Sequence, residues 1–165
     1  MSNDMNKKVI HLLNEYPAMI QKRDILRYEM QHPALGSDQD LLDAMSYFHG
    51  EGAGTPSGGV SDRTLYIAMN FREKAKAMNT EIRKDIVQRL LPLEREIERL
   101  EFYVKMLPDR EQNVIRMLFF EGMNQQQAAK ELGVSTWTVR KYQNDAIDQL
   151  AKMYAFAEGK EEPTS

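Results

Sequence analysis

Residues 124–144 read NQQQAAKELGVSTWTVRKYQN and combine two helix starts with one helix stop. Asn124 is followed three residues later by Gln127, a spacing at which each side chain can accept a hydrogen bond from the backbone N–H of the other. Gly133 suits the left-handed backbone that ends a helix, and Ser135 is a good cap for the next one. The stretch therefore predicts two helices joined by a tight turn.

Apolar residues recur at helical spacing on both sides of this turn. The first helix, residues 125–132, carries Ala128 and Ala129, whose small side chains let two helix backbones approach closely. A preceding helix is predicted to begin at residues 107–111 (LPDRE), because proline suits a first turn and acidic residues complement the positive helix end. The remaining inward positions are Val114, Ile115, Leu118, Phe119, Leu132, Val134, Val139, Tyr142, Ala146, Leu150 and Met153. Together they predict a helix-turn-helix domain over residues 107–154.

The last helix of this domain is polar on its outward face where it begins. In a recognition helix this part enters the major groove of DNA. The candidate DNA-binding residues are Ser135, Thr136, Trp137, Thr138, Arg140, Lys141 and Asn144. Two alternatives remain open for Trp137: contact with a thymine methyl group or a sugar, or packing back onto Met123 or Phe120.

The rest of the chain is also predicted to be helical, which makes the fold class all-α. The expected divisions are an N-terminal helical region (1–48), a glycine-rich linker or loop (49–60), a long helical region (61–106), the helix-turn-helix domain, and a flexible tail (155–165). Helices are expected over residues 5–31 and 41–48, with Pro17 kinking or splitting the first because proline lacks a backbone N–H. Ser61 is expected to cap the long helix.

Apolar residues in the long helical region alternate in steps of four and three. They are Ile86, Leu90, Leu93, Ile97, Leu100, Val104 and Leu107. This spacing is a heptad repeat, which places the apolar side chains in one seam along the helix. Two alternatives remain open: the seam packs on the N-terminal helices within one chain, or it forms a homodimeric coiled coil.

Composition limits the classes of function. The chain contains no cysteine, which excludes disulfides and thiol catalysis and is typical of a cytoplasmic protein. No apolar run is long enough for a membrane span. The histidines His11, His32 and His49 have no acidic or cysteine partners at metal-ligand spacing. We therefore expect no metal, no cofactor, no membrane association and no enzymatic activity.

The charge balance is unusual for a domain that binds nucleic acid. The formal net charge of the chain is -3, and residues 107–154 hold equal numbers of basic and acidic side chains. A neutral domain releases few counterions from DNA and gains little affinity that way. DNA binding is therefore expected to depend on segregated surface charges and on a second protomer or a protein partner.

Residues 107–150 resemble region four of bacterial sigma factors. The resemblance rests on the LPDRE entry, Gly122, the run AAKELGVS at 128–135, and the run TVR at 138–140. It implies two partners, double-stranded promoter DNA and host RNA polymerase. It also implies base contacts from Thr136, Trp137 and Lys141 and phosphate contacts from Arg140 and Thr138. Sigma factors usually carry arginine or glutamate at positions 136–138, so the target sequence does not transfer, and no region-two segment for DNA melting precedes the domain.

The remaining architecture resembles the phage late-operon activators of the ArpU and RinA type. That resemblance rests on residues 12–17 (LLNEYP), residues 58–64 (GGVSDRT), the long middle helix and the C-terminal domain. It implies a phage or prophage sigma-like activator of late genes that acts with host RNA polymerase. Two alternatives stay open: a DNA-recognition protein linked to phage packaging, and a protein-only adaptor that docks on RNA polymerase.

Overall fold

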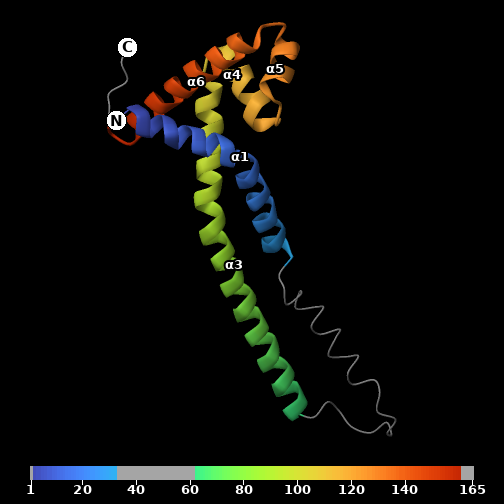
Figure 1. Cartoon of the computed structure of the whole chain (residues 1–165). Helices are drawn as coiled ribbons and strands as arrows, with labels where there is room; N and C mark the ends of the chain where they lie inside the picture. The colour runs from blue at the N-terminus through green and yellow to red at the C-terminus, as the bar shows by residue number, and fades with distance from the viewer. Residues whose placement is uncertain (1, 33–61, 161–165) are drawn as a thin grey trace. The chain divides into compact units, whose positions relative to one another are not determined.

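The computed structural model of the chain describes residues 2–32 and 62–160, and every regular element in those ranges is helical (Figure 1). The elements are α1 (Ser2–Gln31), α3 (Asp62–Lys105), α4 (Asp109–Ile115), the π-helical turn η1 (Arg116–Phe120), α5 (Gln125–Leu132) and α6 (Thr136–Ala157). The predicted all-α class is confirmed. None of the helices in these ranges is long and apolar enough to cross a membrane.

Helix α1 runs through Pro17 without a break and ends at Gln31, as predicted. Of the two predicted effects of Pro17, the split is therefore wrong, and the kink stays a prediction. Pro17 is exposed, so its ring lies on the solvent side, where a missing backbone N–H is tolerated more easily than in the core. Three other predictions, the helix over residues 41–48, the glycine-rich loop over 49–60 and the Ser61 cap, lie outside the described residues.

The chain divides into two compact units whose limits differ from the divisions expected along the sequence. The first unit comprises Met1–Arg23 and Leu93–Ser165, and the second comprises Asp24–Pro92. Both α1 and α3 therefore contribute to both units. The helix-turn-helix shares its unit with the start of α1 and the end of α3.

The larger core of the first unit brings α1, α3 and α6 together (Figure 1). Its fully buried side chains include Val9 and Leu13 from α1, Leu100 from α3, and Leu150 and Tyr154 from α6. Each of these helices has an apolar stripe that it cannot bury alone, so the three stripes cover one another.

The heptad seam of α3 is buried within one chain. Ile97, Leu100, Val104 and Leu107 belong to the core that α1 and α6 complete. These side chains are already covered, so the same seam is not available for a homodimeric coiled coil over this stretch. In the second unit the seam continues to buried Ile86 and Leu90 and, at the same spacing, to Ala75 and Asn79 further upstream.

Hydrogen bonds and a ring stack join α1 to the rest of the first unit. Tyr16 donates a hydrogen bond to Glu101 of α3 at 2.6 Å and stacks on Phe120, with 3.9 Å between ring centroids. Burial, followed by the Glu101 hydrogen bond, raises the pKa of Tyr16 to about 12. Asn6 donates to Asp148 of α6 at 2.6 Å.

A second polar contact lies at the C-terminal end of α6. Glu158 accepts hydrogen bonds from Lys160, at 2.7 Å, and from Lys8 of α1. These two ammonium groups, Lys160 first and Lys8 second, lower the pKa of the Glu158 carboxyl to about 2. Together with the Asn6–Asp148 hydrogen bond, this cluster places the start of α1 beside the C-terminal half of α6.

A smaller core holds the helix-turn-helix itself. Val114, Ala128, Ala129 and Val139 are buried in it, and partly buried Met117, Leu118, Leu132, Val134 and Tyr142 pack around them. The predicted inward positions are confirmed, because those outside this core belong to the larger one: Ile115, Phe119, Ala146, Leu150 and Met153. Helix α6 belongs to both cores, and it continues to Ala157, with Ala155 buried. The start of the expected flexible tail, residues 155–157, is therefore helical.

Candidate nucleic-acid interface

The turn between α5 and α6 has the local geometry that its sequence predicts. The Asn124 side chain accepts from the Gln127 N–H at 2.8 Å, and the Gln127 side chain accepts from the Asn124 N–H at 2.9 Å. Gly133 has φ 66°, in the left-handed region, and the N–H of Val134 returns to the Ala129 carbonyl at 3.0 Å. These bonds satisfy backbone groups at both ends of α5 and set its angle to α6.

Ser135 caps α6 as predicted, because its hydroxyl accepts from the Thr138 N–H at 3.1 Å. The two hydroxyl oxygens of Ser135 and Thr138 are also 2.9 Å apart and share a hydrogen bond. Both residues lie at the predicted DNA-facing end of α6. Both hydroxyl groups already form hydrogen bonds at the start of the helix. Any DNA contact by these two residues would therefore have to leave those bonds in place.

The other predicted contact residues share one exposed face of α6. These residues are Thr136, Trp137, Arg140, Lys141 and Asn144. Trp137 is 69% exposed, so the alternative in which it packs back onto Met123 or Phe120 is wrong. Phe120 instead stacks on Tyr16. An aromatic side chain of this size in solvent at a helix start is suited to contact with a partner surface.

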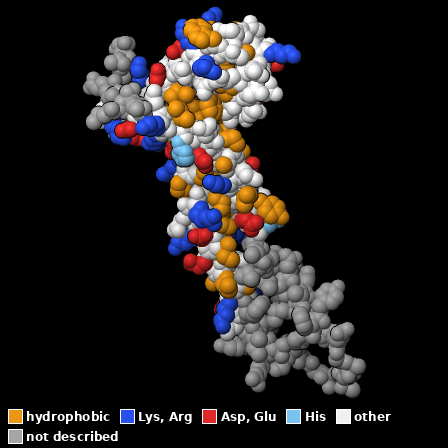
Figure 2. Space-filling model, viewed as in Figure 1, with side chains coloured by type: hydrophobic (Ala, Val, Ile, Leu, Met, Phe, Trp, Pro, Cys, Tyr) orange, Lys and Arg blue, Asp and Glu red, His pale blue; other side chains and the backbone are white. Residues whose placement is uncertain are grey.

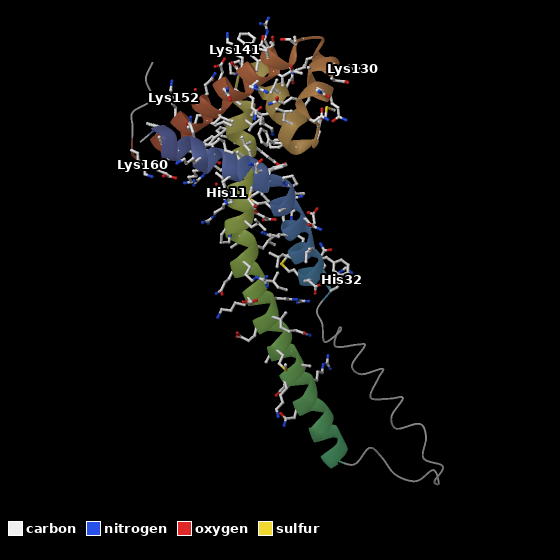
Figure 3. All side chains as sticks on the ribbon, in the orientation of Figure 1. His11, His32, Lys130, Lys141, Lys152 and Lys160 are labelled. Atoms are coloured by element: carbon white, nitrogen blue, oxygen red, sulfur yellow. The ribbon has the colours of Figure 1, made fainter. Side chains whose placement is uncertain are left out.

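Charges are segregated along α6. Residues 136–144 contain Arg140 and Lys141 and no acidic residue, whereas Asp145 and Asp148 follow in the next turn. Asp148 is hydrogen-bonded to Asn6 of α1. Figure 3 shows Lys141 projecting from α6 and Lys130 from α5, while Lys152 lies further toward the C-terminal end of α6. On the face in Figure 2, the helix-turn-helix is mostly uncharged, with isolated Lys and Arg side chains.

One residue that the sequence interpretation missed is Gln125, the first residue of α5. Its amide nitrogen donates to the Gln143 oxygen at 3.0 Å, and its amide oxygen accepts from the Arg140 guanidinium at 3.5 Å. A second link joins α4 to α6, where Arg110 donates to the Tyr142 hydroxyl at 3.3 Å. Spacing along one helix does not reveal such pairs, because each joins two helices.

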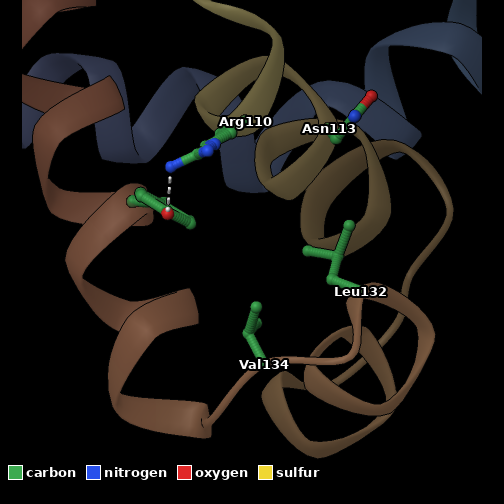
Figure 4. Close-up of a pocket in the computed structure, with 5 residues that line it drawn as sticks. Arg110, Asn113, Leu132 and Val134 are labelled. Atoms are coloured by element: carbon green, nitrogen blue, oxygen red, sulfur yellow. Dashed lines mark hydrogen bonds between the residues drawn. The ribbon is translucent and has the colours of Figure 1, made fainter.

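A hollow of about 370 Å³ lies between α4, the turn and α6. It is lined by Leu132 and Val134 together with Arg110, Asn113 and Tyr142, and Figure 4 shows Arg110 and Asn113 on α4 and Leu132 and Val134 at the turn. Leu132 and Val134 are only partly buried, so the hollow offers apolar surface beside polar groups. No cluster of potential metal ligands is found among the described residues.

These features define the class of protein to which this domain corresponds: a helix-turn-helix with a capped, polar-faced second helix. Residues 104–152 match the family model of sigma-70, region 4. The C-terminal part of the chain is therefore a sigma region-four-like helix-turn-helix, and the match indicates a DNA-binding function connected with transcription. Domains of this family bind DNA and RNA polymerase in general. A search of curated proteins and a search of solved structures each found no match to the chain.

Proposed function

We propose that this protein is a sequence-specific DNA-binding transcriptional regulator, a phage or prophage sigma-like activator of late genes that acts with host RNA polymerase. The observation that carries the proposal is the exposed, acid-free face of α6, where Trp137 lies beside Arg140 and Lys141. Basic side chains next to an aromatic ring at the start of a recognition helix suit phosphate and base-edge contacts in the major groove.

Dependence on the polymerase follows from charge. The helix-turn-helix is neutral overall, so it gains little of the sequence-independent affinity that comes from phosphate contacts. A contact with polymerase already near the promoter would raise the effective concentration of the domain at its site. The hollow lined by Leu132 and Val134 is a surface on which a protein segment could dock.

The same hollow supports a second candidate function, a protein-only adaptor that docks on RNA polymerase without reading bases. The two candidates differ in what the exposed face of α6 does. In the adaptor, Arg140 and Lys141 would not contribute to promoter binding, and transcription would respond to the protein regardless of promoter sequence.

The first experiment separates these candidates by DNA binding. Full-length protein is used to select duplexes from a random-sequence pool, and the selected duplex is then titrated with the wild type and with the Arg140→Ala, Lys141→Ala double variant. We expect an enriched sequence and weaker binding by the double variant, with unchanged helix content because both side chains are exposed. A pool with no enrichment, or equal affinities of the two proteins, would support the adaptor.

A second experiment tests the requirement for the host sigma factor. In vitro transcription from a promoter that contains the selected site is run with core polymerase alone and with core polymerase plus host sigma factor, each with and without this protein. We expect stimulation only when host sigma is present. Initiation by core polymerase and this protein alone would show instead that the chain is a minimal sigma factor.

A further inference from the structure

Gln125 joins the start of α5 to two residues of α6. It is half-buried, and its amide donates to Gln143 at 3.0 Å while accepting from Arg140 at 3.5 Å. Arg140 lies on the exposed face of α6, and Gln143, itself half-buried, lies three residues further along. The three side chains thus form a short chain of hydrogen bonds between the start of α5 and the exposed face of α6.

The polarity of this chain is determined by the chemistry of its members. A glutamine amide has one donor end and one acceptor end, whereas a guanidinium only donates. Because Gln143 accepts from the nitrogen of Gln125, the oxygen of Gln125 is the atom that faces Arg140. The opposite amide orientation would place donors against donors. A guanidinium carries five N–H donors, so one bond to Gln125 leaves others for a ligand.

We propose that Gln125 is a positioning residue that directs the Arg140 guanidinium toward a DNA phosphate. The inference rests on the proposed function, since it gives the DNA-contacting role of α6 a partner on α5. Held by Gln125, Arg140 loses less side-chain freedom when DNA binds. Lys141, the neighbouring basic residue, is also exposed, and the bonds of Gln125 run to Gln143 and Arg140, so Lys141 is a matched control.

The test is a pair of double-mutant cycles on the full-length protein, with a labelled duplex selected from a random-sequence pool as the probe. Gln125→Ala is expected to weaken binding by up to about tenfold, the scale of one lost hydrogen bond. Combined with Arg140→Ala, it should add little, because the residue it positions is gone. Combined with Lys141→Ala, its effect should be additive.

Salt dependence supplies a readout that a purely structural role would not change. Losing Arg140 as a phosphate contact should lower the slope of log affinity against log salt by about one. The slope for Gln125→Ala should lie between those of the wild type and Arg140→Ala. The slope for the double variant should equal that of Arg140→Ala alone. Gln125→Met, which keeps the length of the side chain without its hydrogen bonds, repeats the measurement if the alanine variant is unstable.

A measurement without DNA separates this inference from the proposed function. Nitrogen-15 relaxation of the Arg140 Nε–H group in the free protein should show greater mobility in Gln125→Met than in the wild type. Gln125→Glu, which keeps an acceptor facing Arg140, should preserve the order. If the wild type binds no duplex, the proposed function fails and the phosphate role of Arg140 fails with it. If the wild type binds but both cycles are additive and Arg140 mobility is unchanged, only the positioning role is overturned.

Discussion

Trp137 is 69% exposed, and Phe156 near the other end of α6 is 54% exposed. Neither ring contributes much to the core, so replacing either by alanine should leave the free energy of unfolding within about 0.5 kcal/mol of the wild type. Trp137→Ala should weaken binding to the selected duplex, whereas Phe156→Ala should not. Duplex titration and urea denaturation of both variants measure these effects, and equal affinity of Trp137→Ala and wild type would remove Trp137 from the interface.

The residues of the site differ in how far sequence determines them. Asn124, Gly133 and Ser135 were predicted correctly because a cap or a left-handed turn involves backbone groups only a few residues away. The exposure of Trp137 was left open, because it depends on whether Phe120 is available as a partner. The 69% exposure of Trp137 decides that point, and Phe120 instead stacks on Tyr16, which is far away in the chain.

At the scale of the element, the start of α6 depends on Ser135. Ser135→Ala should lower the free energy of unfolding by about 1 kcal/mol, because the Thr138 N–H loses its acceptor. Ser135→Asp should retain most of the stability, since aspartate also caps a helix and suits its positive end.

DNA affinity should separate these two variants from each other. The added carboxylate of Ser135→Asp lies beside the proposed interface and should repel phosphates, so affinity for the selected duplex should fall although stability is kept. Urea denaturation and duplex titration measure the two quantities. An alanine variant as stable as the wild type would mean that the cap contributes nothing measurable.

The π-helical turn η1 is the element that sequence did not predict. It occupies residues that were expected to continue an ordinary α-helix, and the N–H of Glu121 bonds to the Arg116 carbonyl at 2.9 Å. No residue type in this stretch demands a π-turn. Phe120, the last residue of η1, packs on Tyr16 of α1. The spacing of apolar residues along one helix does not reveal this contact, because it joins two helices.

At the scale of the whole molecule, the buried heptad seam predicts how the protein responds when a charged residue is substituted into the core. Leu100 is fully buried, whereas Leu91 on the same helix is 48% exposed. Leu100→Asp should unfold the protein, because burying an unpaired carboxylate costs several kcal/mol, and Leu91→Asp should remain folded. Circular dichroism and sedimentation distinguish the results. A folded monomer for Leu100→Asp would instead point to a seam between two chains.

The contact between α1 and α6 predicts a dependence of stability on pH. The pKa of Glu158 falls from 4.5 to about 2 on folding. A folded pKa below the unfolded one means that the carboxylate stabilises the native state above pH 4.5 and loses that effect as pH falls toward about 2. Over this window the unfolding midpoint in urea should fall less steeply for Glu158→Gln than for the wild type.

The part of this effect that links the helices can be isolated with Lys8. Lys8→Met removes the ammonium group contributed by α1 and leaves Lys160 in place. In Lys8→Met the urea midpoint should therefore fall with pH less steeply than in the wild type, but more steeply than in Glu158→Gln. A Lys8→Met profile identical to that of the wild type would mean that Glu158 depends on its local partner alone.

Sequence alone determined the helical class, the limits of α5, the caps on both sides of the turn and the inward positions of α4 and α6. These features depend on backbone hydrogen bonds and on apolar spacing within single helices, which a linear sequence contains in full. Tertiary structure decided which partner covers the heptad seam, that the start of α1 joins the unit holding the helix-turn-helix, and that Gln125 meets Arg140. An apolar stripe specifies that it must be buried but not by what, so the choice between α1 and a second chain is made only when the helices pack.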